Sequence, residues 1–467
     1  MKMENDLGRD SVRSLVWRIA IPSMMGQFVS VLYSIVDRIY VGHIAEVGDL
    51  ALAGVGICGP IVTMVGSAAF LVGIGGAPLM SIRMGEGRLE QAQKILSSCF
   101  WMLLAFAAVL TVGLLPLRGS MLRLFGASPV TYPYAETYFT IYLCGTVFAL
   151  MASGLNQFII CQGYARVGMA AVVLGAVLNI LLDPLFMFAL RLGVAGAALA
   201  TVLSQAGSAA FALLFLRSGR TPVRLRFGRP VPRLAGRVLL LGLTPFLIIA
   251  VDNVMIISMN AVLQRYGGAG RGDMLVTCNT IVQSFMLVVT MPLGGISGGT
   301  QSILSYNYGA CRTDRVRKAQ RYIAALCLGF TAILFVLARL GGGLFVRLFT
   351  EDAALADQAV RAIRICTLAV IPLGIQYAIV DGFTAMGQVQ LALPLSAWRK
   401  LVYFTAVFAL PAALGADAVF YAEPISDVLG PAASIAVYAL CIRKLLARRV
   451  EEARRAGLQL EQSGTSL

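Results

Sequence analysis

Long apolar segments dominate this sequence and limit what it can fold into. Runs of about 20 to 25 apolar residues, each long enough to cross a hydrocarbon core of roughly 30 Å as a helix, follow one another along the chain. Hydrophobic residues make up 58% of the sequence and charged residues only 13%, whereas soluble domains carry about 25% charged residues. In lipid, each backbone polar group must be satisfied within the segment, which favours helices. The pattern predicts an all-α polytopic membrane protein.

The breaks between these runs predict 12 transmembrane helices. The expected spans are 15–41, 51–80, 95–117, 133–160, 169–190, 194–216, 238–263, 275–305, 322–343, 365–386, 391–414 and 419–442.

Lys and Arg residues cluster in alternate breaks and predict the orientation. The net charge is +15, but the basic residues lie between apolar runs rather than along one solvated face, which argues against a nucleic-acid partner. Basic loops favour the cytoplasmic side, so both termini are expected to be cytoplasmic and the number of spans to be even. The break from Arg339 to Arg364 is expected outside although it is basic. The densest cluster comprises Arg217, Arg220, Arg224, Arg226, Arg229, Arg233 and Arg237.

The two halves of the chain repeat at a nearly constant offset in the numbering. Pro22 matches Pro245, and Gly163 matches Gly387. An offset that is kept all the way from Pro22 to Gly163 indicates duplicated six-helix lobes of the same orientation, which are typical of transporters. The predicted parts are an N-terminal lobe (1–216), a cytoplasmic basic linker (217–237), a C-terminal lobe (238–442) and a cytoplasmic charged tail (443–467).

Four polar residues of the N-terminal half lie inside predicted spans. An ionised carboxylate in hydrocarbon is costly, so Asp37 and Asp183 need a reason to be there. Asn179 lies four residues before Asp183 and therefore on the same helix face. Asp37, Asn179, Asp183 and Thr201 are predicted at one level of their spans. Such oxygen ligands suit Na⁺ or a carboxylate pair that shares one proton.

The repeat separates this set from the common scaffold. At the same offset, the C-terminal half carries Asn260, Tyr403, Val407 and Ile425 in place of Asp37, Asn179, Asp183 and Thr201. Acids needed only for the fold would be expected in both halves. We therefore predict a cation-coupling site, the alternative being a satisfied polar cluster that fixes helix packing.

The C-terminal half has its own candidates for substrate contact. Asp252 and Asp381 lie in predicted spans, and methionines supply deformable, polarisable surface. Glu423 and Asp427 are four residues apart and are expected to be structural. The candidate substrate-binding residues are Asp252, Asn253, Met255, Met259, Gln283, Met286, Tyr377 and Asp381.

Five motifs together resemble the multidrug and toxic compound extrusion (MATE) family, along essentially the whole chain. The last is similar to the bacterial branch of MepA-like and DinF-like drug exporters. Two positions depart from the family pattern. Some members have a glutamate in the seventh helix, and Asp252-Asn253 is one residue out of register with it. Other members have an aspartate in the tenth helix, and Asp381 lies about six residues after that position. The motifs are VDRIYVG (36–42), LNILLDP (178–184), GAALATVLSQ (196–205), GTQSILSYNYGA (299–310) and YAEPISD (421–427).

The resemblance implies a V-shaped pair of six-helix lobes and a function in export. It implies an antiporter that moves organic cations outward in exchange for Na⁺ or H⁺, with the coupling ion at Asp37, Asn179, Asp183 and Thr201. It also implies a monomer in the inner membrane of a prokaryote, surrounded by lipid and without a cofactor. A lipid-linked precursor flippase of the same superfamily remains an alternative, as does a scaffold or receptor. An enzyme is not expected, because the chain has one histidine and no evident nucleophile with its base.

Overall fold

The computed structural model describes residues 5–44, 48–125, 127–228, 230–268, 271–350 and 352–455. The described part of the chain is almost entirely helical, and two compact units can be distinguished in it. One unit contains Met1–Asp10 and Ile21–Ile249, and the other contains Ser11–Ala20 and Ala250–Leu467. The boundaries at Ala20 and Ile249 both fall inside helices.

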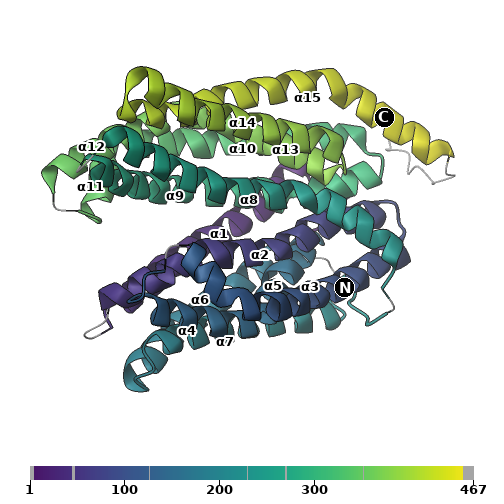
Figure 1. Cartoon of the computed structure of the whole chain (residues 1–467). Helices are drawn as coiled ribbons and strands as arrows, with labels where there is room; N and C mark the ends of the chain where they lie inside the picture. The colour runs from purple at the N-terminus through teal and green to yellow at the C-terminus, as the bar shows by residue number, and fades with distance from the viewer. Residues whose placement is uncertain are drawn as a thin grey trace. The chain divides into compact units, whose positions relative to one another are not determined.

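The first unit contains the N-terminal copy of the repeat (Figure 1). Its close packing depends on glycine where backbones meet. A Cβ atom on Gly75 would lie 2.1 Å from the carbonyl oxygen of Val238, and one on Gly242 would lie 1.7 Å from that of Leu71. These contacts explain why the first part of α8 belongs to this unit. Its helices are α1 (Val12–Gly42), α2 (Gly48–Gly85), α3 (Leu89–Leu124), α4 (Tyr132–Cys144), α5 (Thr146–Ile160), α6 (Ala165–Pro184), the π-helix η1 (Leu185–Ala189), α7 (Val194–Arg217) and the start of α8 (Pro232–Gly267).

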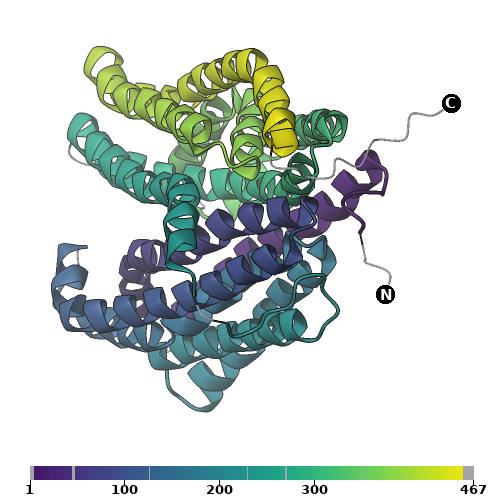
Figure 2. The ribbon, with the colours of Figure 1, turned by 90° about the vertical axis from the view of Figure 1, so that its right-hand side faces the viewer.

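The second unit contains the C-terminal copy. Helices α14 and α15 pack along each other, as the yellow-green and yellow ribbons show in both views (Figures 1 and 2). Helix α15 continues past the predicted end at 442, and the last part of the predicted tail, 456–467, lies outside the described residues. The further elements of this unit are α9 (Arg271–Gly309), α10 (Thr313–Leu340), α11 (Gly342–Arg347), α12 (Ala353–Cys366), α13 (Val370–Ala385), α14 (Val389–Leu414), the 3₁₀ helix η2 (Ala416–Tyr421) and α15 (Ala422–Arg455).

The predicted span 133–160 is a bent pair of helices rather than a single helix. The predicted span 365–386 starts too late, because α12 begins at Ala353, inside the segment expected as an outer loop, and forms a second bent pair with α13. Helices α4 and α5 meet at Gly145 with a bend of 56°, and α12 and α13 meet with a bend of 49°. Ala369, which precedes α13, is the repeat counterpart of Gly145, which precedes α5, so the repeat extends to this irregular feature. A Cβ atom on Gly145 would lie 2.3 Å from the Val202 side chain, which shows how closely α7 approaches the first bend.

Nine helices in the described ranges are long and apolar enough to cross a membrane, or eleven if each bent pair is one span. Helix α14 occupies the remaining predicted span, 391–414, but is not among them. The adjacent Arg399 and Lys400 lower its mean hydropathy. The all-helical, duplicated membrane architecture predicted from the sequence is confirmed.

The turns after α2 and α9 also repeat. Gly87 (φ +75°) and Cys311 (φ +59°) occupy equivalent positions of the repeat, and both adopt the left-handed conformation. Glycine adopts it without steric cost, whereas cysteine does so only under constraint from its surroundings. The fold therefore imposes this turn even where the sequence no longer favours it.

Candidate functional site

The C-terminal end of α1 is held in a tight apolar core of the first unit. Val41 is fully buried there with Ala51 and Cys58 of α2 and Phe139 of α4. This packing fixes the last turns of α1 and with them Asp37, one turn before Val41. A carboxylate thus stands on a rigid helix beside an apolar core.

Asp37 meets the two predicted polar residues of α6. The Asp37 and Asp183 side chains lie within hydrogen-bonding reach of each other. Asn179 donates from Nδ2 to Asp183 Oδ1 at 3.3 Å. Asp183 is fully buried and Asn179 is 1% exposed. Three of the four residues predicted at one level are therefore in one cluster, which we call the N-terminal carboxylate pair (Asp37, Asp183) with its amide (Asn179).

Apart from the Asn179 amide, no donor to the N-terminal carboxylate pair is seen in the described structure. Asp37 Oδ1, Asp183 Oδ2 and Asn179 Oδ1 are all buried without a hydrogen-bond partner in the described structure. Two ionised carboxylates offer only acceptors, so they cannot hydrogen bond to each other unless one is protonated. Buried polar atoms are normally satisfied, and three unsatisfied oxygens in one cluster call for an external cation or proton. The residues fit the predicted exchange of Na⁺ or H⁺ at this site.

Thr201 joins the cluster through a tyrosine. Its Oγ1 donates to the carbonyl oxygen of Ala197 at 3.0 Å on α7. It also lies within hydrogen-bonding reach of the Tyr138 hydroxyl group, and Tyr138 is close enough to Asp37 to interact electrostatically. Tyr138 of α4 is only 7% exposed. It is a candidate site residue that our sequence analysis missed, because it belongs to no motif and only the packing of α4 against α7 brings it to Thr201.

The second unit carries no such pair at the equivalent positions. Asn260, at the position of Asp37, accepts a hydrogen bond from Asn279 Nδ2 at 2.9 Å. Tyr403, at the position of Asn179, donates from its hydroxyl group to Met259 Sδ at 3.1 Å. The four repeat positions are thus neutral: Asn260 and Tyr403 form hydrogen bonds, and Val407 and Ile425 are apolar. The carboxylate pair is a property of the first unit.

Asp252 of the second unit is held in an ion pair. The Lys400 ammonium group donates a hydrogen bond to Asp252 Oδ1. One helical turn further along α15 from Glu423, Asp427 accepts from Arg399 Nη1 at 2.7 Å. Sequence reasoning did not predict either pair, since the partners are between 28 and 148 residues apart.

The remaining candidate substrate contacts fall in different places. Asp381 of α13 lies within hydrogen-bonding reach of Ser297 and Gln301 of α9. Tyr377, one turn earlier on α13, packs against Gly294 of α9, whose Cβ would lie 3.8 Å from its ring. Three methionines are buried, while Asn253 and Gln283 are partly buried; the methionines are Met255, Met259 and Met286. The eight residues therefore do not form one group bonded together.

No group of three or more His, Cys, Asp or Glu side chains gathers as a metal site in the ranges that the structure describes. The N-terminal carboxylate pair has two carboxylates, an amide oxygen and, through Tyr138, a hydroxyl group. These oxygen donors suit a hard monovalent ion rather than a transition metal.

A family model places the chain among known proteins. The model named MatE matches residues 22–185 and 249–404, which together cover more than half of the chain. The two matched segments lie in the two copies of the repeat.

Curated relatives match along most of the length. The chain is 23% identical over 421 residues to a multidrug export protein MepA from Staphylococcus haemolyticus, covering 90% of this chain and 91% of that protein. It is 21% identical over 435 residues to MepA from Staphylococcus aureus strain MRSA252, covering 92% and 95%.

Solved structures share the fold. An outward-facing multidrug resistance MATE family transporter of the MOP superfamily superimposes with a TM-score of 0.86 at 23% identity, over 95% of this chain and 99% of that one. A MOP superfamily transporter from Pyrococcus furiosus gives a TM-score of 0.89 at 23% identity, over 95% and 99%, and is described as having a binding pocket of reverse polarity that suggests a different function. A shared fold therefore leaves the substrate's charge to be judged from this chain's own residues.

Proposed function

Because the chain belongs to the MatE family of membrane proteins, we propose that it is a secondary active antiporter. It exports cationic or amphipathic organic compounds in exchange for Na⁺ or H⁺ by alternating access. It carries out transport rather than a chemical reaction, and it needs no cofactor.

The N-terminal carboxylate pair is the observation that carries this proposal. Asp37 and Asp183 face each other with buried oxygens that have no donor among the described residues. Their mutual repulsion in a medium of low dielectric constant is relieved when a cation or a proton enters. Entry of the coupling ion from outside is therefore favourable, and the same ion is the one that must leave on the cytoplasmic side.

Neutralisation of the pair provides the link to a conformational change. Asp37 is on α1, which contains Pro22 fifteen residues earlier. Proline removes a backbone hydrogen bond and so gives a helix a point at which it can bend. With the ion bound, α1 bends near Pro22 and the cationic compound loses its hold. Reopening to the inside then releases the ion.

The charge of the second unit favours a cationic compound over an anionic one. A flippase for a lipid diphosphate would need free basic groups in the spans. The basic residues that stand out there, Arg399 and Lys400, are already paired with Asp427 and Asp252. The relatives named multidrug export proteins agree with a drug-like substrate.

The setting follows from the topology predicted above. The protein resides in the inner membrane of a prokaryote as a multi-pass monomer surrounded by lipid, with both termini in the cytoplasm. Its transported partners are small organic cations, not nucleic acids.

Efflux from everted vesicles tests the coupling role. We expect ethidium uptake into vesicles that contain the parent protein when a Na⁺ or pH gradient is imposed, and loss of gradient-driven uptake with Asp37→Asn. The substitution removes the charge but keeps the shape of the side chain. Varying the two gradients separately identifies the coupling ion.

Glu136→Gln is the matched control. Glu136 pairs with Arg118 in the same unit, and both side chains are about one-third exposed. The control neutralises a carboxylate of the first unit outside the site, so transport should persist. Parent-like uptake with Asp37→Asn would refute the coupling role.

A further inference from the structure

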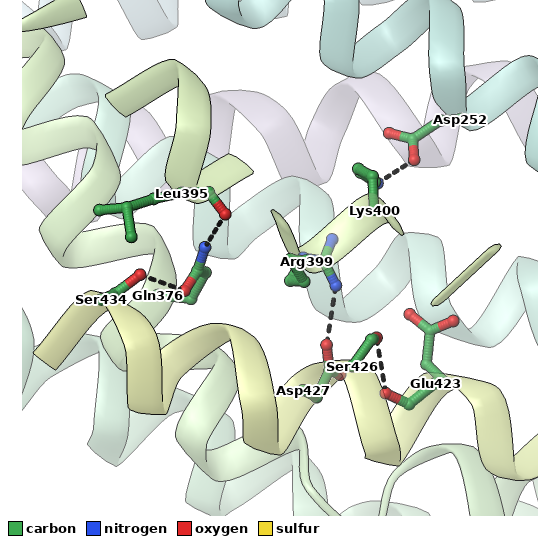
Figure 3. Close-up of polar contacts among 9 residues, drawn as sticks. All are labelled: Asp252, Gln376, Leu395, Arg399, Lys400, Glu423, Ser426, Asp427 and Ser434. Atoms are coloured by element: carbon green, nitrogen blue, oxygen red, sulfur yellow. Dashed lines mark hydrogen bonds and ion pairs between the residues drawn. The ribbon is translucent and has the colours of Figure 1, made fainter. Parts of the chain in front are cut away.

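A mixed cluster of charges lies within the second unit, where α8, α14 and α15 approach one another (Figure 3). We call it the C-terminal charge network. It has three carboxylates and two cationic groups, so it carries one negative charge in excess when all are ionised. Its members are Asp252, Arg399, Lys400, Glu423 and Asp427.

The two cations of the network are held in fixed positions. Lys400 is 11% exposed and pairs with Asp252, and Arg399 is 13% exposed and pairs with Asp427, which is fully buried. The stem of Arg399 lies across α15 at Gly430, where an added Cβ would come within 2.8 Å of its Cγ atom. Such packing leaves the guanidinium group little freedom to move to another carboxylate.

Glu423 is the one carboxylate of the network without an ion pair among the described residues. Among the described residues its side chain forms neither an ion pair nor a hydrogen bond, and only its backbone oxygen accepts, from Ser426 at 2.8 Å. Asp427, four residues on and on the same face of α15, has a fully buried Oδ2 with no partner in the described structure. Two acceptor positions, one partly buried and one fully buried, thus remain without a donor beside each other.

Glu423 and Asp427 lie in the first turns of α15, within a candidate membrane span, and Asp252 of the same network lies far from the end of α8. Asp252 is 15 residues before the end of α8 at Gly267, about 22 Å at 1.5 Å per residue. Asp37 is only five residues, about 8 Å, from the end of α1 at Gly42. The candidate span that contains Glu423 runs from Ala416 to Arg455. An unpaired acid at such a position is costly and indicates a function.

The repeat does not require the network. At the same offset, the first unit carries apolar or small residues at all five positions: Val29, Gly175, Ala176, Leu199 and Leu203. Both copies fold without a common charge at these positions. The network is therefore an addition to the scaffold of the second unit.

We propose that the partly buried Glu423, with the charge of the buried Asp427 behind it, binds the cationic group of the transported organic compound. This proposal rests on the proposed function and assigns its substrate site. One partly buried carboxylate suits an ammonium or phosphonium group that keeps an apolar body, better than a small ion that must replace a full shell of oxygens. Tyr403 and Met259, in contact at 3.1 Å, and Tyr377, which lies within electrostatic range of Asp252 and Asp427, provide aromatic and thioether surface nearby.

Binding of tetraphenylphosphonium to the purified full-length protein tests the site. We expect Glu423→Gln to raise the Kd for this cation at least about tenfold, since a charge-assisted contact is lost. The Kd for the uncharged dye Nile red should stay within about twofold, because the apolar surface is untouched. Glu423→Asp, which keeps the charge, should recover most of the affinity for the cation.

Glu452→Gln is the matched control on the same helix. Glu452 is half-exposed and pairs with Arg448, away from the network. Parent-like affinity for tetraphenylphosphonium is expected with this variant. Thermal unfolding of each variant shows that the compared proteins are folded.

Three outcomes overturn the assignment. The first is an unchanged Kd for tetraphenylphosphonium with Glu423→Gln. The second is an equal loss for Nile red, which indicates a purely structural role. The third is a parent-like Kd for the cation together with a lost response to Na⁺ or pH, which assigns Glu423 to the coupling ion instead.

The test separates this site from the proposed antiport. If the parent shows no gradient-driven ethidium uptake but its tetraphenylphosphonium binding depends on Glu423, the antiporter proposal fails and the site stands. If Asp37→Asn abolishes uptake while Glu423→Gln binds and transports cations like the parent, the site fails and the antiporter proposal stands.

Discussion

The two buried charge clusters of this protein lie on equivalent helices of the repeat and are built in opposite ways. In the first unit, α1, α6 and α7 bring together Asp37 and Asp183, and neither carboxylate forms an ion pair among the described residues, although Arg38 is adjacent to Asp37. In the second, α8, α14 and α15 place Arg399 and Lys400 beside three carboxylates. In our proposal the first cluster takes its cation from outside the protein, whereas the second cluster contains two cations of its own and one carboxylate in excess. The two copies of the duplicated scaffold thus differ in how their buried charges are balanced.

The comparison also shows how little the shared scaffold depends on these charges. Each charged position of the two clusters corresponds to a neutral residue in the other unit, such as Asn260 for Asp37 and Gly175 for Arg399. Kinked helices, bent pairs and left-handed turns recur in both copies, but the charges do not. Features required by packing are repeated, and the charges to which we assign a function are specific to one copy.

The largest effect on stability is expected from breaking an ion pair of the second unit. Arg399→Met leaves Asp427 fully buried without a counterion, and we expect a loss of about 3–5 kcal/mol in the free energy of unfolding. Thermal unfolding in detergent measures it. The double variant Arg399→Met/Asp427→Leu removes both charges and should lie much closer to the parent. A single variant as stable as the parent would show that the pair is not structurally coupled.

Removing a charge from the N-terminal carboxylate pair is expected to raise the free energy of unfolding rather than lower it. Asp183→Asn removes one of two facing carboxylates and supplies a donor for Asp37, so the free energy of unfolding without Na⁺ should rise by about 1–3 kcal/mol while coupled transport is lost. Asn179→Asp, which adds a third carboxylate beside the pair, should be less stable than the parent. If Asp183→Asn lowers the stability, the pair is a satisfied structural cluster and the contrast with the second unit disappears.

The smallest effects concern the bent helices. Gly145→Ala places a Cβ atom against Val202, for which we expect a loss of about 1–3 kcal/mol in the free energy of unfolding. Ala369→Gly, at the corresponding break of the second copy, should cost only about 0.5–1 kcal/mol, because it removes a single buried methyl group and adds backbone freedom. Chemical unfolding of both variants measures the difference. Gly145→Ala/Val202→Ala should restore stability, and equal losses at the two breaks would mean that the bends pack alike.

Much of the fold could be predicted because local amino-acid composition identifies membrane helices. The apolar runs, their basic flanks and the repeat offset predicted the helices without knowledge of any contact. The bend at Gly145 could not be seen, because no charge or proline interrupts the apolar run at that point. The bend before Val370 was missed because Arg361 and Arg364 were placed in an outer loop, whereas both lie on α12. The bend at Gly145 depends on a contact with another helix, since an added Cβ atom there would lie against the Val202 side chain of α7.

The candidate sites also contain some residues that could be grouped from the sequence and others that could not. Asn179 and Asp183 could be grouped from their spacing, and Asp37 from its depth, since helix geometry determines both. Tyr138 and the Arg399–Asp427 pair could not be predicted, because no local spacing brings residues of different helices together. The eight residues proposed for substrate contact were chosen by type alone, and they turned out to have different neighbours.

The sequence by itself determined that this is a duplicated helical membrane protein with acids in one copy that its repeat lacks, because hydrophobicity, spacing and offset are properties of the chain. Only the tertiary structure decided which charges have partners. It paired Asp252 with Lys400 and Asp427 with Arg399, and left Glu423 and the facing oxygens of Asp37 and Asp183 without donors in the described residues. The physical reason is that the energy of a buried charge depends on its nearest neighbours in space, which helix packing alone selects.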